Sequence, residues 1–464
     1  MSNKFPALIL CVFLAIARTA MADVSDEPSV GGVPEYGAEV CCSVCPRVED
    51  RAAYVSEYMR GYRVVVEGKD GWLFRTDAEL QWFEPNDPDL WPSLKRLIDA
   101  LKAKGSTVLM FPQPPRGLVE SAMIPPEARA KYDLIELQRR YSELVSKLRD
   151  AGAIVADGSV FSNNQGTQYF YKRDGHWKAA GSERAAQMIA NQIHGAGFTF
   201  TPKEFTTFQT GLTGSKGTMT QVVDTLCGVR YPVEYGPAYQ TKTPATDDLF
   251  GDASAPEVAL VGTSFSATPA YNFHGFLRSA LKTDIYQAAK SGGGFDGAMS
   301  EYLVSDLYQQ TPPKFIVWEF PYQQLQRTTT TVMRRLIPLV SNGCAGKKAL
   351  LKGTAKLEQK TEPVEAVVNG SGAFITVPAK NLWFDFQFSD PNIREIQAEV
   401  WYADGRFQTI NSQYNAYTNM NGRFVLETNY LPDTENQSIV SIRIKSNTPT
   451  PPNTEVATTV CSHE

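Results

Sequence analysis

One acid and one histidine stand two positions apart in a chain of 464 residues that has only 4 histidines. Asp174 and His176 flank Gly175 in the stretch "YFYKRDGHWKAAG" (169–181). In an extended segment residues i and i+2 point to the same side, and Gly175 permits a tight local turn. The Asp174 carboxylate can therefore fix the tautomer of the imidazole, as in the orienting half of a nucleophile–His–Asp relay. The alternative is an acid and a histidine on an exposed loop.

The nucleophile for this relay is predicted at Ser264, in the stretch "VALVGTSFSATPAYNF" (258–273). Four apolar residues end in Gly262, and a strand that stops there exposes the serine hydroxyl at the carboxyl edge of a sheet, where ligands bind. The motif is not the Gly-x-Ser-x-Gly elbow, because Ser266 replaces the last glycine. A serine at a strand end is also a common helix N-cap, which is the alternative interpretation.

Two further sets of residues fit the same chemistry. The block "SGGGFDG" (291–297) follows a predicted strand, and the backbone N–H groups of Gly292 and Gly293 are candidates for stabilising an oxyanion. Cations flank the acid–histidine pair and are candidates for holding an anionic polysaccharide, although a solvated basic loop would look the same. They are Lys172, Arg173 and Lys178.

An α/β framework is predicted to position these residues. From Trp91 to Phe320 apolar strands alternate with amphipathic helices, which is typical of a mostly parallel sheet with helices on both faces. His194, at the end of a predicted helix, is interpreted as an end cap rather than a ligand. The predicted strands cover 106–112, 153–159, 257–266, 284–289 and 314–320, and the predicted helices 91–105, 128–152 and 179–195.

A second unit is predicted after Cys344. Four stretches there alternate apolar and polar residues between turn signals, as the strands of an antiparallel β-sandwich do. They cover 374–390, 394–412, 422–432 and 438–446. The expected division is a leader at 1–22, the α/β domain at 23–345 and the sandwich at 346–464.

The leader has the features of a cleavable secretory signal. Lys4 precedes an uncharged apolar stretch that is too short to span a bilayer, and Ala20-Met21-Ala22 is a small-x-small cleavage signal. The formal net charge of the whole chain is −5, and losing the two cations of the leader makes it more negative, which argues against a nucleic-acid partner. We therefore expect an exported protein.

Six cysteines remain after the leader, and in an oxidising compartment they favour disulfides over metal ligands. Cys344 and Cys461 bracket the sandwich and are predicted to pair. Cys227 is predicted to pair with one member of the cluster Cys41, Cys42 and Cys45, and the spacing does not decide which. Cys42-x-x-Cys45 has no second ligand pair for structural zinc, so no metal site is predicted.

Taken as a set, these motifs resemble the SGNH/GDSL hydrolase superfamily. The order Asp174, His176, Ser264 is permuted relative to most of its members, in which the serine comes first. That order, with "DGHW", "GTSFS", "KDGWLFRTD" (69–77), "SGGGFD" and "PAYNF", resembles the periplasmic alginate O-acetyltransferases from about Asp70 to the C-terminus. Such proteins carry a carbohydrate-binding module after the catalytic domain.

The resemblance implies roles for individual residues. Ser264 would be the nucleophile, His176 the base and Asp174 its orienter, with Tyr271 and Asn272 lining the site. Arg116, in "PPRGL", would stand at its mouth.

In the sandwich, the resemblance makes Trp401 and Arg406 the candidate polysaccharide binders, with Trp401 as a core residue the alternative. Gln397 and Glu399 depart from the family pattern, in which a lysine and a hydroxyl are expected.

The resemblance also implies an activity and partners. An acetyl group would pass through a Ser264 acyl-enzyme to hydroxyls of mannuronate in alginate. A membrane-bound acetyltransferase, within a periplasmic and outer-membrane secretion complex, would supply that acetyl group. No cofactor is expected, since the chain has no nucleotide-binding glycine fingerprint after its first strand. Two alternatives are an exported acetylesterase with the same triad and a non-catalytic glycan-binding scaffold.

Overall fold

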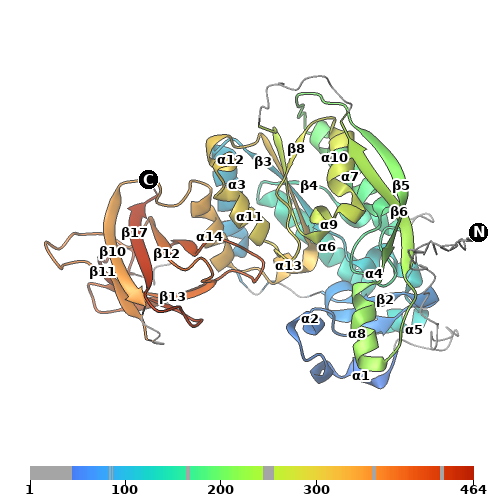
Figure 1. Ribbon diagram of the computed structural model, residues 1–464, viewed down its shortest axis with the longest axis horizontal. Helices are drawn as coiled ribbons and strands as arrows, with labels where there is room; N and C mark the ends of the chain where they lie inside the picture. The colour runs from blue at the N-terminus through green and yellow to red at the C-terminus, as the bar shows by residue number, and fades with distance from the viewer. Residues whose placement is uncertain are drawn as a thin grey trace, which may run out of the picture.

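The computed structural model describes residues 44–82, 85, 87–163, 168–243, 255–357, 362–428 and 433–463. These residues form an α/β unit and a β-sandwich that lie side by side (Figure 1). The predicted leader, together with Cys41 and Cys42, lies outside the described residues. Within those ranges no helix is long and apolar enough to cross a membrane.

A five-stranded parallel sheet is the centre of the α/β unit, as predicted. Every residue of β7 and β9 is buried, as expected for strands covered on both faces. The strands run in the order β4 (Ile154–Val155), β3 (Thr107–Gln113), β9 (Phe315–Pro321), β7 (Val258–Val261) and β8 (Ile285–Gln287).

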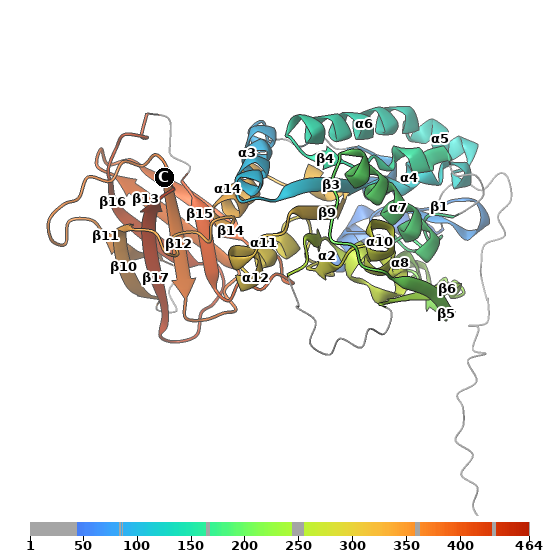
Figure 2. The same cartoon turned by 90° about the horizontal axis from the view of Figure 1, so that it is seen from above.

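Successive side chains of these strands enter two different hydrophobic cores. Val261 and Trp318 belong to the core under one face, which is covered by α3 (Leu90–Ala103), α6 (Leu134–Asp150), α11 (Gly297–Leu303) and α14 (Thr330–Leu339). Leu260 and Val317 belong to the core under the other face, covered by α7 (Ala179–Gly195) and α10 (Phe273–Leu281). Figure 1 shows the sheet with α3 and α11 on one side and α7 and α10 on the other, and Figure 2 shows the same unit from above, beside the sandwich.

The structure departs from the sequence prediction at two places. The single helix expected over 128–152 is two helices, α5 (Pro126–Lys131) and α6, because Asp133 caps α6 by accepting a hydrogen bond from Glu136 N. A long antiparallel ribbon of β5 (Thr206–Ser215) and β6 (Glu234–Lys242), visible along the outer side of the unit in Figure 1, was not predicted.

The remaining elements of the α/β unit are short. They are β1 (Val65–Glu67), β2 (Leu73–Arg75), α1 (Pro46–Glu49), α2 (Glu57–Arg60), α4 (Arg116–Val119), α8 (Thr218–Cys227), α9 (Ser264–Ala267), α12 (Asp306–Gln310) and α13 (Tyr322–Gln326). The blue segment of Figure 1, residues 44–82, lies beside α8 and is bound to it by a disulfide between Cys45 and Cys227.

The C-terminal unit consists of two four-stranded antiparallel sheets, as predicted. One has the order β10-β17-β12-β15 and the other β11-β16-β13-β14. The predicted disulfide between Cys344 and Cys461 joins the start of this unit to its last strand. The strands are β10 (Ala349–Leu357), β11 (Val364–Val368), β12 (Leu382–Phe388), β13 (Glu395–Tyr402), β14 (Phe407–Gln413), β15 (Arg423–Glu427), β16 (Ile439–Ser446) and β17 (Thr454–Ser462).

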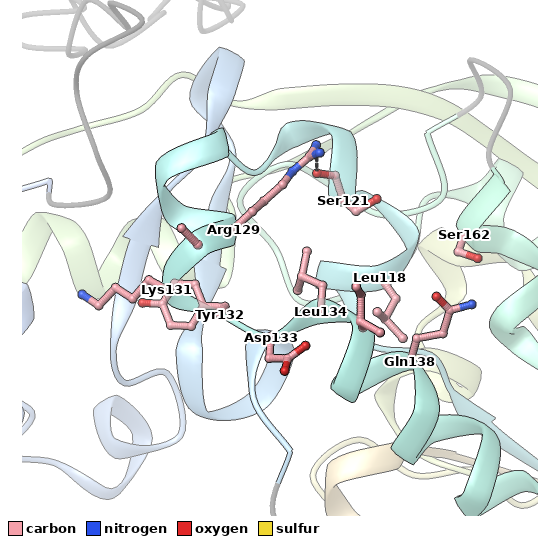
Figure 3. A pocket seen from close by; sticks show the side chains of 11 residues that line it. Leu118, Ser121, Arg129, Lys131, Tyr132, Asp133, Leu134, Gln138 and Ser162 are labelled. Carbon is pink, nitrogen blue, oxygen red and sulfur yellow. Dashed lines mark hydrogen bonds between the residues drawn. The ribbon is translucent and has the colours of Figure 1, made fainter.

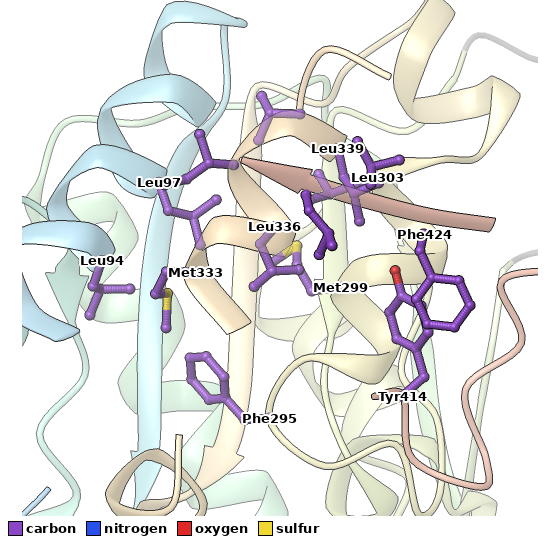
Figure 4. Packing of buried hydrophobic residues seen from close by; sticks show 14 of the residues in the cluster. Leu94, Leu97, Phe295, Met299, Leu303, Met333, Leu336, Leu339, Tyr414 and Phe424 are labelled. Carbon is purple, nitrogen blue, oxygen red and sulfur yellow. The ribbon is translucent and has the colours of Figure 1, made fainter. Parts of the chain in front are cut away.

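The two units share one hydrophobic core. Met333 and Leu336 of α14 belong to the same buried cluster as Leu94 of α3 and Phe424 of β15 (Figure 4). Arg335, which is only 3% exposed, pairs with Asp296 of the α/β unit. Its guanidinium also lies 4.2 Å from the centre of the Tyr414 ring on the sandwich side. The position of the sandwich is therefore fixed by packing and not by a linker alone.

Candidate active site

The acid and the histidine lie in a tight hairpin-like turn. Tyr171 N donates to the carbonyl of His176 (3.1 Å), and Lys178 N donates to that of Tyr169 (2.9 Å). At the tip, His176 N donates to the Asp174 carboxylate at 3.1 Å. A turn therefore brings the two side chains together. The sequence analysis had instead argued from an extended segment.

A continuous hydrogen-bonded chain joins Asp174, His176 and Ser264. The Asp174 Oδ1 to His176 Nδ1 distance is 2.6 Å, and His176 Nε2 lies 2.7 Å from Ser264 Oγ. Because the carboxylate accepts from Nδ1–H, Nε2 is left to accept the serine proton. Ser264 begins α9 directly after β7, so the serine stands at the carboxyl edge of the sheet.

Asp174 has two further partners that sequence reasoning missed. Ser215 Oγ donates to it at 3.0 Å and Thr218 Oγ1 at 3.2 Å, from the end of β5 and the start of α8. Burial would raise the pKa of the Asp174 carboxyl, but the hydrogen bonds from His176 and Ser215 and the charge of a protonated imidazole outweigh it and hold the pKa well below the usual range. The carboxylate is therefore ionised whenever the site is at work.

Two aromatic rings hold the imidazole. The ring of Tyr271 stacks on His176 with 5.4 Å between centres, and the ring of Phe265 lies 4.7 Å from it. Burial raises the pKa of the Tyr271 hydroxyl, so it stays protonated. The structure thus places Tyr271 at the predicted site. Asn272, its neighbour, instead directs its amide to Thr241 Oγ1 of β6, at 3.1 Å.

A buried acid lies under the serine turn. Glu319 of β9 has no exposed surface, and its carboxylate accepts from Thr263 N (3.0 Å), Thr263 Oγ1 (3.1 Å) and Ser266 Oγ (2.8 Å). Burial raises the pKa of Glu319 against the effect of these hydrogen bonds. Glu319 thus ties Thr263 and Ser266, which lie on either side of Ser264 in the sequence, to the adjacent strand.

The sequence analysis expected Arg116 at the mouth of the site, but the structure buries this residue. It is 2% exposed, pairs with Glu79 at 2.6 Å, and donates to the carbonyls of Leu73 and Tyr171. These bonds fasten the turn that carries Asp174 to β2. A guanidinium needs this many acceptors when it is buried, so the position is structural.

The predicted cations also differ from one another in the structure. Arg173 is 9% exposed, donates to Pro232 O at 2.9 Å and covers the Tyr231 ring, so it is a packing residue and not a binder. Lys172 is half-buried, and its ammonium reaches the carbonyl of Asp70. Lys178 pairs with Glu234 at 2.6 Å. The expected basic groove is therefore not formed by these residues.

The glycine block packs against the sandwich. A Cβ at Gly292, where φ is +77°, would stand 2.6 Å from the ring of Tyr417, and the carbonyl of Gly293 accepts from Asn415 Nδ2 at 2.6 Å. This close approach accounts for Gly292, and the backbone N–H of Gly293 donates to Lys290 O rather than toward Ser264. The oxyanion role of Gly292 and Gly293 gains no support from it.

Trp401 lies on the outer face of its sheet and not in the sandwich core. Its neighbours Val400 and Tyr402 are buried, whereas Trp401 is partly exposed and stacks on Phe407 with 4.5 Å between ring centres. Arg443 covers the indole. Arg406 is exposed at the following turn and pairs with Asp404.

The pocket drawn in Figure 3 is not this site. It has a volume of about 650 Å³ and is lined mainly by residues of α4, α5 and the start of α6. Arg129 closes one side of it by donating to the carbonyl of Ser121. Asp174, His176 and Ser264 do not line this pocket. The candidate site is therefore identified by its hydrogen-bonded side chains and not by the size of a pocket.

Comparison with known proteins agrees with this architecture. A family model described as "SGNH hydrolase-like domain, acetyltransferase AlgX" matches residues 65–322, and one described as a C-terminal carbohydrate-binding module matches residues 343–464. The solved structure of Pseudomonas aeruginosa AlgX is similar with a TM-score of 0.79 and 30% identity, covering 90% of this chain and 99% of that one.

Two groups of curated relatives are similar in sequence. The alginate biosynthesis protein AlgX of Pseudomonas putida is 33% identical over 89% of this chain and 88% of its own length. The probable alginate O-acetylase AlgJ of Pseudomonas aeruginosa is 31% identical over 56% of this chain and 70% of its own length.

Proposed function

Because the chain belongs to the AlgX family of SGNH hydrolase-like acetyltransferases, we propose that it transfers acetyl groups to hydroxyls of mannuronate residues in alginate. The observation that carries this proposal is the hydrogen-bonded chain of Asp174, His176 and Ser264 at the carboxyl edge of the sheet. Both the serine and the imidazole, whose side chain is 19% exposed, are accessible to a substrate.

The chemistry follows from the geometry. His176 Nε2 takes the proton of Ser264 as Oγ attacks the acetyl carbonyl carbon, and the bond to the donor's leaving group breaks as that group receives the proton. A sugar hydroxyl then gives its proton to Nε2 and attacks the acyl-enzyme, and Oγ recovers the proton as the ester is released. Asp174 keeps the imidazole oriented and stabilises its charged form.

The polysaccharide is proposed to be held in part by the C-terminal module. Trp401 presents a partly exposed indole, and Arg406 lies nearby as an exposed cation. Glu399 lies within 3.4 Å of the indole Nε1, and Gln397 and Glu399 supply no cation where the family pattern has one. We therefore place the main recognition of the acceptor at the α/β unit.

The cellular setting is part of the same proposal. Two disulfides and the predicted leader favour an oxidising compartment outside the cytoplasm, which we propose to be the periplasm. The acetyl group would then come from a membrane-bound partner of an alginate secretion complex rather than from free acetyl-CoA. Efficient use of free acetyl-CoA by the purified protein would contradict this part.

One assay separates transfer from hydrolysis. The purified protein is incubated with a small acetyl ester, with and without oligomannuronate, and acetyl is measured on the sugar and as free acetate. Acetylated oligomannuronate is expected, and the Ser264→Ala variant should fold and produce none. Acetyl found only as acetate would favour the esterase, and no turnover of any ester by a folded wild-type protein would favour the scaffold.

A further inference from the structure

Arg75 is the cation that the structure places beside the relay. It ends β2, and its guanidinium lies against Gly175, between the acid and the histidine. A Cβ added to Gly175 would stand 3.0 Å from Arg75 Nη2 and 3.3 Å from its Cζ. Gly175 does not have a positive φ, so the turn itself does not require glycine. The missing side chain instead leaves room for the guanidinium.

Arg75 shares its hydrogen-bonded carboxylate with a second arginine. Arg75 and the buried Arg116 share the single carboxylate of Glu79, at 2.7 and 2.6 Å. Arg116 also donates to backbone carbonyls, whereas Arg75 uses only Nε, Nη2 and its backbone N–H, all toward Glu79. In the described part of the chain Arg75 Nη1 has no hydrogen-bond partner, and the side chain is 14% exposed.

Asp174 is the other carboxylate near Arg75, but among the described residues no hydrogen bond joins the two. Asp174 is 5% exposed and already accepts hydrogen bonds from His176, Ser215 and Thr218. Tyr62, whose ring centre lies 5.3 Å from the guanidinium carbon, is a neutral neighbour. Arg75 Nη1 is therefore the donor that remains available to an incoming anion.

A small cavity connects this cation with the nucleophile's neighbour. Arg75, Gly175 and Phe265 line the same cavity of about 10 Å³, which is about the space of one water molecule or one oxygen atom of a ligand. Phe265 follows Ser264 directly and packs against the imidazole. An anion bound by Arg75 would therefore lie on the side of the relay that Gly175 and Phe265 border.

We propose that Arg75 binds the carboxylate of the uronate residue that is being acetylated. This inference rests on the proposed function and adds to it the residue that recognises the charged acceptor. The guanidinium is pre-positioned by Glu79 and offers Nη1 to the carboxylate, and hydrogen bonds of this charge-assisted kind are the strong ones. Arg75 acts only on the acceptor, so formation of the acyl-enzyme does not depend on it.

The test compares Arg75→Gln with the wild type on two acceptors, oligomannuronate and the same oligosaccharide with its carboxylates reduced to alcohols. The KM for oligomannuronate should rise about tenfold to a hundredfold, as expected for the loss of a hydrogen bond to a charged group. Hydrolysis of a small acetyl ester, measured in parallel, should fall by a much smaller factor than transfer to oligomannuronate. With the reduced acceptor the variant and the wild type should have equal KM values.

Two more variants make the result decisive. Arg230→Gln removes a largely exposed cation elsewhere on the unit and should change no parameter. Arg75→Lys keeps the charge beside Glu79, and its smaller rise in KM should again be confined to the charged acceptor; it decides the question if Arg75→Gln does not fold. An unchanged KM, or an equal rise for both acceptors, overturns the role of Arg75. Failure of the wild type to acetylate either acceptor refutes the proposed function instead.

Discussion

At the scale of single residues, the proposed relay of Asp174, His176 and Ser264 predicts how the reaction depends on pH. The pKa of Asp174 is lowered in the folded protein, so its carboxylate stays charged as the pH falls. It loses its negative charge only below that lowered pKa. Loss of activity in mild acid would then not come from Asp174 and would report protonation of the proposed base. We expect kcat/KM to rise through one ionisation between about pH 6 and 8.

The Asp174→Asn variant tests the same relay. It should fold and lose activity by a factor on the order of 10⁴, as in serine proteases, because the orienting charge and the tautomer are both lost. Near-normal activity of this variant, or a flat profile of the wild type from pH 5 to 8, would show that His176 is not the base.

Glu319 is predicted to position the nucleophile without touching the substrate. In Glu319→Gln an amide N–H₂ replaces one of the oxygens that accept from Thr263 and Ser266, and the serine turn should shift. We expect kcat for a small acetyl ester to fall about tenfold to a hundredfold, since small displacements of a reacting group are costly. KM and the pH midpoint should stay unchanged, and a variant with wild-type kcat would contradict the role.

At the scale of elements, the sequence could predict those segments that bury an apolar pattern. The five strands of the parallel sheet and helices α3 and α7 are of this kind. Ribbon β5–β6 could not be predicted, because most side chains of β5 are exposed and leave no alternation of buried and exposed positions. Its end nevertheless supplies Ser215 to the site.

The site could be predicted only where its residues form local motifs. Asp174, His176 and Ser264 stand in such motifs, whereas Thr218 reaches the site through the fold and carries no local signal. Arg75 lies in the quoted stretch "KDGWLFRTD", but nothing in that stretch pointed to the arginine itself. Glu319 had a signal that was not used: it is the one acid in the apolar stretch "KFIVWEF", and a buried carboxylate must find hydrogen-bond donors.

The disulfide between Cys45 and Cys227 is predicted to matter for catalysis as well as for stability. It anchors α8, whose first residue, Thr218, donates to Asp174. Replacing both cysteines by serine should lower the free energy of unfolding by about 2–5 kcal/mol and also lower kcat. The matched Cys344→Ser, Cys461→Ser variant should lose stability in the sandwich and retain kcat on a small ester. Equal kcat in the two variants would contradict a role of the Cys45–Cys227 disulfide in catalysis.

At the scale of the whole molecule, the shared core predicts that the two units unfold together. Leu336 is fully buried in the cluster that includes residues of both. Leu336→Ala should cost about 2–5 kcal/mol and shift a single unfolding transition, followed by tryptophan fluorescence and by circular dichroism. Leu212→Ala, at a position 71% exposed, is the control and should stay within about 0.5 kcal/mol of wild type. Two separate transitions would disprove the coupling.

The place of β17 has a consequence for how the protein is made. This strand, the last in the sandwich, pairs with both β10 and β12 and is therefore interior to its sheet. Until residues 454–462 have folded into place, both neighbours expose unpaired backbone edges, which favour aggregation. Because α14 packs on β15 of the same sheet, the apolar face of α14 also stays exposed until that sheet has formed. A translation stop or proteolytic cut a few residues before β17 would leave a chain that holds every catalytic side chain and still requires a chaperone.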